Sequence, residues 1–198
     1  MPDFDLHAIL YLLFTLVILF QNFSYSKPGN FFGYVITIFV ALFVLDLISG
    51  LIHIFLDRYN GENPYIKPVA DSFKEHHDDP AGMVKGTNLE VMLQVRLLWF
   101  ILAFLVLINY VLRNSPFISY VTLFSTLLAL IGPFLQVSHR LSHLMVHDPP
   151  PKNSTSFIVL NFLQKNGVLL NPELHRKHHK INDKHWPIFN GWSSNFMD

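Results

Sequence analysis

Histidine is concentrated near the end of this chain, in positions whose spacing could bind a metal. The stretch LHRKHHKINDKHWPIFNGW covers residues 174–192 and holds four of the chain's 11 histidines. Imidazole is the commonest metal ligand among side chains. His175, His178 and His179 stand at i, i+3 and i+4, so a helix would present all three on one face. His139 and His143, at i and i+4, can likewise point at one centre.

Polar residues that could orient these imidazoles occur at related spacings. Asp46, Gly50, His53 and Asp57 form one helical stripe. A carboxyl inside a membrane-spanning helix costs roughly 2.5–3.5 kcal/mol, so Asp46 is expected to have a partner or a function. We expect Asp57 to fix an imidazole tautomer by a hydrogen bond. Asp46 is expected to do the same deeper in the bundle, to line a substrate tunnel, or only to make an interhelical hydrogen bond. Gln136, one turn before His139, is a further candidate for orienting a ligand.

The composition is that of a membrane protein. The chain has 198 residues, of which 51% are hydrophobic and only 14% charged. Soluble domains carry about 25% charged residues. The formal net charge of zero gives no basic field for nucleic acid, so no nucleic-acid partner is expected. The absence of cysteine excludes thiolate ligation by this chain.

Four apolar segments approach the ~20 residues that a bilayer core requires. The expected spans are residues 6–23, 31–55, 97–112 and 117–137, and the fourth is expected to continue as a helix through SHRLSHLMVH. A shorter stretch, FIVLNFLQKNGVLL, is expected to be an interfacial amphipathic helix. We predict one all-α integral membrane domain over residues 1–198, with four transmembrane helices and a histidine-rich cap.

The positive-inside rule assigns the sidedness of this arrangement. With four spans, twelve of the 14 lysines and arginines fall on the side of both termini, and only Lys27 and Arg113 fall on the other. That side should face the cytosol or its topological equivalent. His53, the His76–His77 pair in the presumed loop FKEHHDDP, the His139–His143 pair and the C-terminal cluster all fall there. Nine histidines would therefore meet at one membrane face. Trp186 and Trp192 are expected to anchor at the interface, and Gly50 to permit close helix packing.

So many imidazoles exceed the four ligands of one zinc and suit two metal ions. Imidazole accepts zinc, copper and iron, so the ligand type alone does not choose the metal. The Glu-x-x-His pattern of soluble di-iron bundles is missing from the chain. A pair of irons held by histidines at a membrane face instead indicates an integral-membrane oxygenase or desaturase.

Several motifs together resemble the Kua family of lipid desaturases over about residues 40–192. They are DLISGLIHIFLD, FKEHHDDPAGM, SHRLSH, HRKHH and HWPIFNGW. By that resemblance the metal ligands are His53, His76, His77, His139, His143, His175, His178, His179 and His185. Ile54 stands where family members usually have tryptophan, and FNGW replaces the usual TTGW.

The resemblance implies a di-iron, O2-dependent enzyme that introduces a double bond into an acyl or alkyl chain of a membrane lipid. Zinc is a conceivable substitute for the two irons, and the implied electron donor is a cytochrome b5 or a ferredoxin. Two alternatives remain open at the level of sequence. One is a lipid hydroxylase with the same metal cage, and the other is a catalytically silent, desaturase-like subunit of a larger membrane complex.

Overall fold

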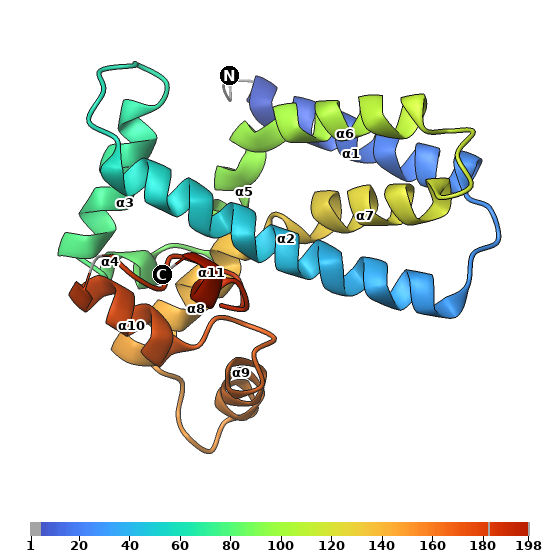
Figure 1. Ribbon diagram of the computed structural model, residues 1–198. Helices are drawn as coiled ribbons and strands as arrows, with labels where there is room; N and C mark the ends of the chain where they lie inside the picture. The colour runs from blue at the N-terminus through green and yellow to red at the C-terminus, as the bar shows by residue number, and fades with distance from the viewer. Residues whose placement is uncertain (1–4, 182, 198) are drawn as a thin grey trace. The chain divides into compact units, whose positions relative to one another are not determined.

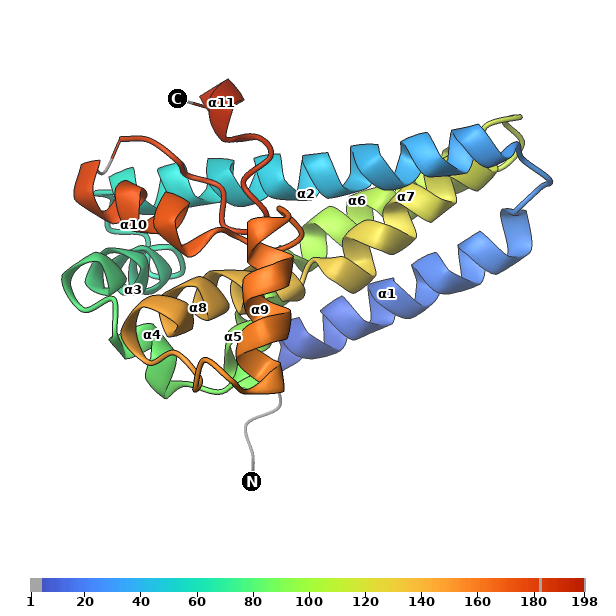
Figure 2. The same cartoon turned by 90° about the horizontal axis from the view of Figure 1, so that it is seen from below.

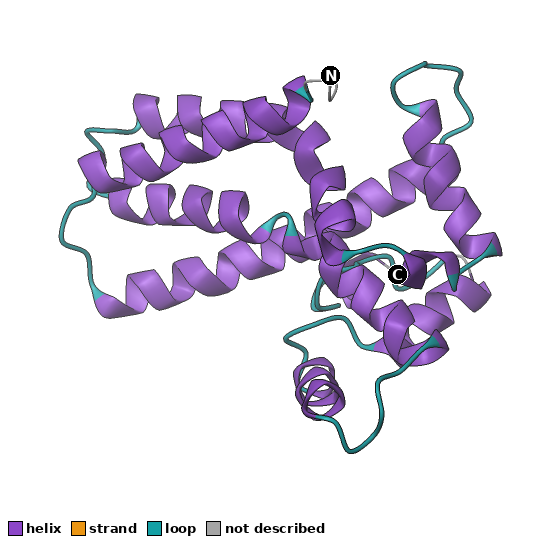
Figure 3. Ribbon diagram, turned by 180° about the vertical axis from the view of Figure 1, so that it is seen from behind, coloured by secondary structure: helices purple, strands orange, loops and turns teal. Residues whose placement is uncertain are grey.

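The computed structural model describes residues 5–181 and 183–197, and these contain helices and no strands (Figure 3). The helices are α1 (Leu6–Tyr25), α2 (Phe31–Arg58), α3 (Lys67–Asp78), α4 (Gly82–Lys85), α5 (Asn88–Gln94), a 3-10 turn (Val95–Leu98), α6 (Trp99–Val111), α7 (Ile118–Ile131), α8 (Phe134–His147), α9 (Thr155–Lys165), α10 (Pro172–Ile181) and α11 (Ser194–Met197). The predicted all-α class is confirmed.

Two helices, α1 and α2, are long and apolar enough to cross a bilayer. Two helix pairs, α5 with α6 and α7 with α8, also pass if each interrupted pair counts as one span. The described residues therefore offer two to four candidate spans, at positions that agree with the expected ones. The expected continuation as a helix through SHRLSHLMVH agrees with α8, which ends at His147, but the expected span 117–137 is interrupted, because α7 ends at Ile131 and α8 begins at Phe134. Pro133 explains the break, since proline lacks the N–H of the helical ladder and its ring clashes with the preceding turn.

The sequence patterns missed four of the described helices: α3, α5 and the four-residue helices α4 and α11. His76 and His77 lie on α3 and not in a loop. Pro68 stands in the first turn of α3, where proline is tolerated, and neither glycine nor a further proline interrupts the segment until Pro80. Helix α5 begins after a capping box, in which the Thr87 hydroxyl accepts from the Glu90 N–H and the Glu90 carboxylate accepts from the Thr87 N–H. The sequence TNLE carried this signal.

The chain forms two compact units, Met1–Val44 with Met92–Pro133, and Leu45–Val91 with Phe134–Asp198. In the first unit α1, α6 and α7 pack side by side (Figure 1). A buried polar network joins them: Asn109 donates to Gln21 Oε1 at 3.1 Å and accepts from Ser125 Oγ at 3.0 Å. In an apolar medium such bonds fix which helix faces meet, because an unpaired amide there is costly.

The second unit holds the histidines. Helices α3, α8 and α10 lie beside the C-terminal part of α2 (Figure 2), and the ring of His53 on α2 packs against a histidine from each of them. Helix α10 begins where Asn171 accepts hydrogen bonds from the N–H groups of Glu173 and Leu174, as an N-cap does. Arg140 of α8 donates to the carbonyls of Val84 and Gly86 and so fixes the α4–α5 connection against α8. Helix α8 is thus fixed to the α4–α5 connection by a side chain other than histidine.

Candidate metal centre

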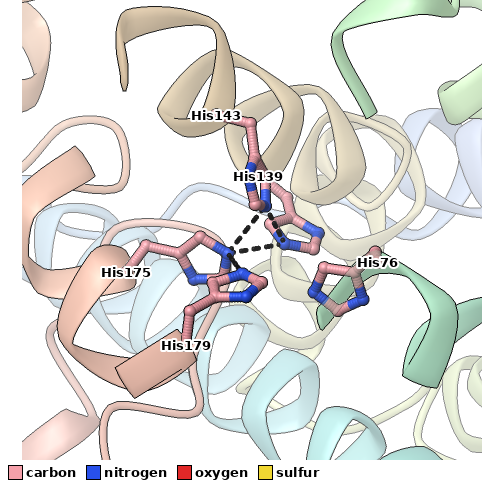
Figure 4. Close-up of side chains that lie close together, drawn as sticks. All are labelled: His76, His139, His143, His175 and His179. Carbon is pink, nitrogen blue, oxygen red and sulfur yellow. Dashed lines mark hydrogen bonds between the residues drawn. The ribbon is translucent and has the colours of Figure 1, made fainter. Parts of the chain in front are cut away.

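Two groups of potential metal ligands lie within the second unit. The first consists of His76, His139, His143, His175 and His179, which we call the five-histidine cluster (Figure 4). The second consists of His53, Asp57, His77 and His178, which we call the Asp57 cluster. Within each cluster one nitrogen or oxygen atom per residue lies within 4.8 Å of all the others. Eight of the nine predicted ligands are therefore brought together by the fold.

The five-histidine cluster is assembled from α3, α8 and α10. Helix α8 supplies His139 and His143 from successive turns, and α10 supplies His175 and His179 in the same way, as their i, i+4 spacing predicted. His175 Nε2 lies 2.8 Å from the Nε2 of His139, 3.0 Å from that of His143 and 3.0 Å from that of His179. His76 completes the ring of imidazoles from α3 (Figure 4).

The contacts between these Nε2 atoms are those of ligands around a cation. A neutral imidazole carries only one N–H, so four converging nitrogens cannot satisfy one another as donors and acceptors. Two nitrogens bound to one metal at about 2.1 Å and at right angles lie about 3.0 Å apart. The observed 2.8–3.2 Å separations match that value. The donor set therefore fits a metal ion.

Backbone carbonyls select the tautomer of three histidines. The Nδ1 of His53 donates to the carbonyl of Trp186 at 2.9 Å, and the Nδ1 of His178 donates to the carbonyl of Lys184 at 2.8 Å. The Nδ1 of His76 donates to the carbonyl of Phe73. Because a carbonyl can only accept, Nδ1 must carry the proton in each ring, and Nε2 keeps a free lone pair.

The Nε2 atoms left by this arrangement are buried and unsatisfied. Within the described part of the chain, the Nε2 of His53, His76 and His178 has no hydrogen-bond partner. Burying an unpaired polar atom costs about 1–3 kcal/mol, so three such atoms aimed at shared centres call for a ligand. A metal ion in each cluster would provide it, since deprotonated Nε2 is a metal-binding form of imidazole.

The Asp57 cluster is organised around one carboxylate oxygen. Asp57 Oδ2 lies 2.9 Å from His77 Nε2, 3.3 Å from His53 Nε2 and 3.8 Å from His178 Nε2. It contacts His77 by a hydrogen bond, and its distances to His53 and His178 are compatible with atoms that share one cation. Asp57 was expected to orient a ligand. It lies where it could also bind the ion itself, because carboxylate oxygen is an accepted ligand of divalent metals.

Burial keeps the imidazoles outside the candidate spans uncharged. Desolvation, reinforced by the neighbouring imidazoles, lowers the pKa of His76 and of His179 to about 2. Burial also holds the pKa of His175 well below its ordinary value of 6.5, with His139 and His143 adding to the effect. These rings are therefore neutral near pH 7, as metal binding requires.

The remaining predicted site residues lie around the clusters. Gln136 Oε1 lies 3.4 Å from His139 Nδ1, in reach of orienting that ring. His185 belongs to neither cluster and adopts a left-handed backbone with φ of 61°. Asp46 is fully buried, and its carboxylate accepts hydrogen bonds from the segment 190–193. Trp186 is only 2% exposed, so the expectation of an interface anchor is wrong for it. Its ring packs against His53 and His178 instead.

Comparison with known proteins gives the family. The family model of the lipid desaturase domain matches residues 40–198. The chain therefore belongs to the lipid desaturase domain family, and the resemblance drawn from the histidine motifs is confirmed. No curated protein and no solved structure matches the chain.

Proposed function

We propose that this protein is a membrane-bound lipid desaturase that uses two irons, one in each histidine cluster. The observation that carries the proposal is the pair of ligand groups: five imidazoles in one, and three imidazoles with one carboxylate in the other. Membership of the lipid desaturase domain family supports an oxidoreductase acting on a lipid chain. All nine predicted histidines, His185 included, are kept as ligands in this proposal, with His185 contributing from the turn that follows α10.

The reaction removes two adjacent hydrogens from an acyl or alkyl chain. One O2, two electrons and two protons are consumed for each double bond formed, and two waters leave. A bound iron pair would supply the redox chemistry that makes O2 competent to abstract those hydrogens. The protein supplies neutral nitrogen ligands, holds them at fixed angles and keeps bulk water away, since His53, His139, His175 and His178 are at most 2% exposed.

The residues around the ligands have positioning roles in this proposal. The carbonyls of Phe73, Lys184 and Trp186 hold three rings with Nε2 directed inward. Outer partners of this kind typically contribute 10–100-fold in metal affinity or activity. Gln136 would act in the same way on His139, and Asp57 would bind or orient ligands in its own cluster.

The substrate and the partners follow from the chemistry. A lipid chain has to reach the site from the bilayer, and electrons have to arrive from a soluble or membrane-anchored carrier such as a cytochrome b5 or a ferredoxin. We propose that the histidine clusters and both termini lie on the cytosolic side or its equivalent, as the distribution of lysine and arginine indicates. Subunits of a larger membrane complex are also conceivable partners.

The experiment compares two variants of one helix. His143 lies in the five-histidine cluster, and His147 lies one turn further along α8, exposed and outside both clusters. Wild type, His143→Ala and His147→Ala would be expressed in cells that lack the gene, and their lipids analysed by mass spectrometry. Purified protein would be analysed for metal.

If the protein is a desaturase, cells that express wild type or His147→Ala will contain lipids that have lost two hydrogens. Cells that express His143→Ala will have unchanged lipids. About two irons per wild-type chain are expected. Products that have gained one oxygen would assign hydroxylation instead. Wild-type protein without metal and without any effect on cell lipids would refute an enzyme and favour the silent subunit.

A further inference from the structure

The residues Lys184–Ser193, which we call the C-terminal strap, run along the second unit and are largely buried. Trp186, Ile188, Phe189 and Asn190 are each at most 6% exposed. Two carbonyls of the strap, those of Lys184 and Trp186, accept the Nδ1–H of His178 and of His53. The left-handed residue His185 lies between these two carbonyls. The strap thus decides where two ligand rings point.

One face of α2 holds the strap. Asp46, Ser49, Gly50 and His53 stand at i, i+3, i+4 and i+7, so they form one stripe. Ser49 Oγ accepts from the N–H of Ile188 at 3.1 Å and donates to the carbonyl of Asp46 at 2.7 Å. The last residue of the stripe is itself a ligand of the Asp57 cluster.

Gly50 lets the strap approach this stripe closely. A Cβ at Gly50 would lie 3.2 Å from Pro187 Cγ and 2.6 Å from Met197 Sδ. The close packing expected at Gly50 therefore involves the strap and α11.

Asp46 makes the densest set of bonds to the strap. Its Oδ1 accepts from the N–H groups of Asn190 and Gly191 at 2.9 and 3.0 Å. Its Oδ2 accepts from the N–H and the hydroxyl of Ser193, both at 2.8 Å. Gly191 has φ of 80°, a conformation that glycine adopts without strain, and this turns consecutive N–H groups toward the carboxylate. A buried carboxylate with four donors is satisfied without any contact to an imidazole.

We infer that Asp46 is a positioning residue for the Asp57 cluster, acting through the C-terminal strap. The carbonyls of Trp186 and Lys184 accept from His53 and His178, both members of that cluster, whereas the strap's Phe189 carbonyl accepts from Ser138 on α8, which belongs to neither cluster. Losing the carboxylate should loosen the strap and weaken one metal site selectively. This inference rests on the proposed function, because it assumes that the clusters bind metal.

The test measures metal affinity. Asp46→Asn keeps the size of the side chain but replaces one carboxylate oxygen by an amide NH2, which cannot accept a hydrogen bond. If the NH2 takes the place of Oδ1, the N–H groups of Asn190 and Gly191 lose their acceptor. If it takes the place of Oδ2, the N–H of Ser193 loses its acceptor. Purified protein in detergent would be loaded anaerobically with Fe2+, and the two binding steps resolved by chelator competition. Ser125→Ala is the matched control, since Ser125 is a buried, hydrogen-bonded serine of the first unit.

In Asp46→Asn we expect one of two Fe2+ sites to weaken about 10–100-fold, as outer-partner losses do, while the other keeps wild-type affinity. The Ser125→Ala control should keep both. In a His178→Ala background, Asp46→Asn should have little further effect, which assigns the weakened site to the Asp57 cluster. Equal weakening of both sites, or no weakening, would overturn the inference.

Two milder variants cover a failure of Asp46→Asn to fold. Ser49→Ala and Ser193→Ala each remove one hydroxyl that joins the strap to α2, and both leave the Asp46 carboxylate in place. They should weaken the same site by a smaller factor, and wild-type affinity at both sites in both variants would overturn the inference. Wild-type protein that binds two Fe2+ but never desaturates lipid would remove the proposed function while leaving this inference standing. Wild-type protein that binds no Fe2+ would end both.

Discussion

Mild acid should destabilise the metal-free protein by an amount that the buried histidines determine. The pKa of His76 and of His179 is lowered to about 2, and that of His175 lies well below 6.5. When the chain unfolds, each ring returns to an ordinary pKa near 6.5. At pH values between the folded and the unfolded pKa of a ring, only the unfolded state binds a proton on that ring. Stability is therefore fully present above about pH 6.5 and is lost as the pH falls toward the folded pKa values.

The size of the effect follows from the unfolded pKa alone, as long as the folded rings stay neutral. One pKa unit corresponds to about 1.36 kcal/mol. Lowering the pH from about 7.5 to about 5.5 should therefore cost about 1.4 kcal/mol for each buried imidazole, or about 4 kcal/mol for His76, His175 and His179 together. Domains are typically stable by about 5–15 kcal/mol, so this loss should be easy to measure.

The assay is thermal or denaturant unfolding of metal-free protein in detergent at the two pH values. In His175→Asn the loss should shrink by about 1.4 kcal/mol, because one proton-binding group disappears from the unfolded state. In Ser125→Ala the stability should be lower at both pH values, with the acid-induced loss unchanged. Bound metal should raise stability at either pH, since it binds only the folded form. A metal-free protein equally stable at both pH values would refute the view that the folded rings are buried and neutral.

Three further outcomes are expected. His178→Ala should abolish desaturation while the chain still inserts into membranes. Lys177→Ala, on the exposed side of the same helix, should keep the desaturase activity. Lipid mass spectrometry of cells that express each variant measures this activity. Asp57→Asn should weaken one metal site about 10–100-fold, measured by chelator competition, and unchanged affinity would contradict a role for the carboxylate. Asn109→Leu should lower the unfolding free energy by about 1 kcal/mol through two lost interhelical bonds, at about 0.6 kcal/mol each, without changing metal stoichiometry. A change in bound metal in that variant would show that the first unit influences the site.

Helical periodicity and hydropathy were sufficient for much of the fold. The expected span over residues 31–55 corresponds to α2, Phe31–Arg58, and the span over 97–112 to α6, Trp99–Val111. These segments are long and apolar, so their sequence signal is strong. Short polar helices were harder to predict, since α3 and α5 lack an apolar stripe of that length. The prediction of a single domain over residues 1–198 stays a prediction.

The i, i+4 histidine pairs determined which rings share a face, because helix geometry is local. The sequence grouped His139 with His143, and His175 with His178 and His179. The structure keeps both i, i+4 pairs together but places His178 in the Asp57 cluster. The sequence could not divide the histidines into two clusters, because that division depends on how α2, α3, α8 and α10 pack. For one pair the sequence did indicate the division: adjacent side chains diverge, so His76 and His77 were expected to serve two neighbouring centres, and they belong to different clusters.

By itself, the sequence determined a family, an apolar helical frame and a set of imidazoles suited to metal. The tertiary structure decided which imidazole nitrogens keep a free lone pair, because carbonyls distant in the chain fix the tautomers of the rings. Trp186, whose carbonyl orients the His53 ring, lies 133 residues from it in the sequence. It also decided the partner of Asp46, 144 residues away at Asn190. Both outcomes depend on hydrogen bonds between distant segments, and the spacing of residues along a chain carries no information about such bonds until the helices have packed.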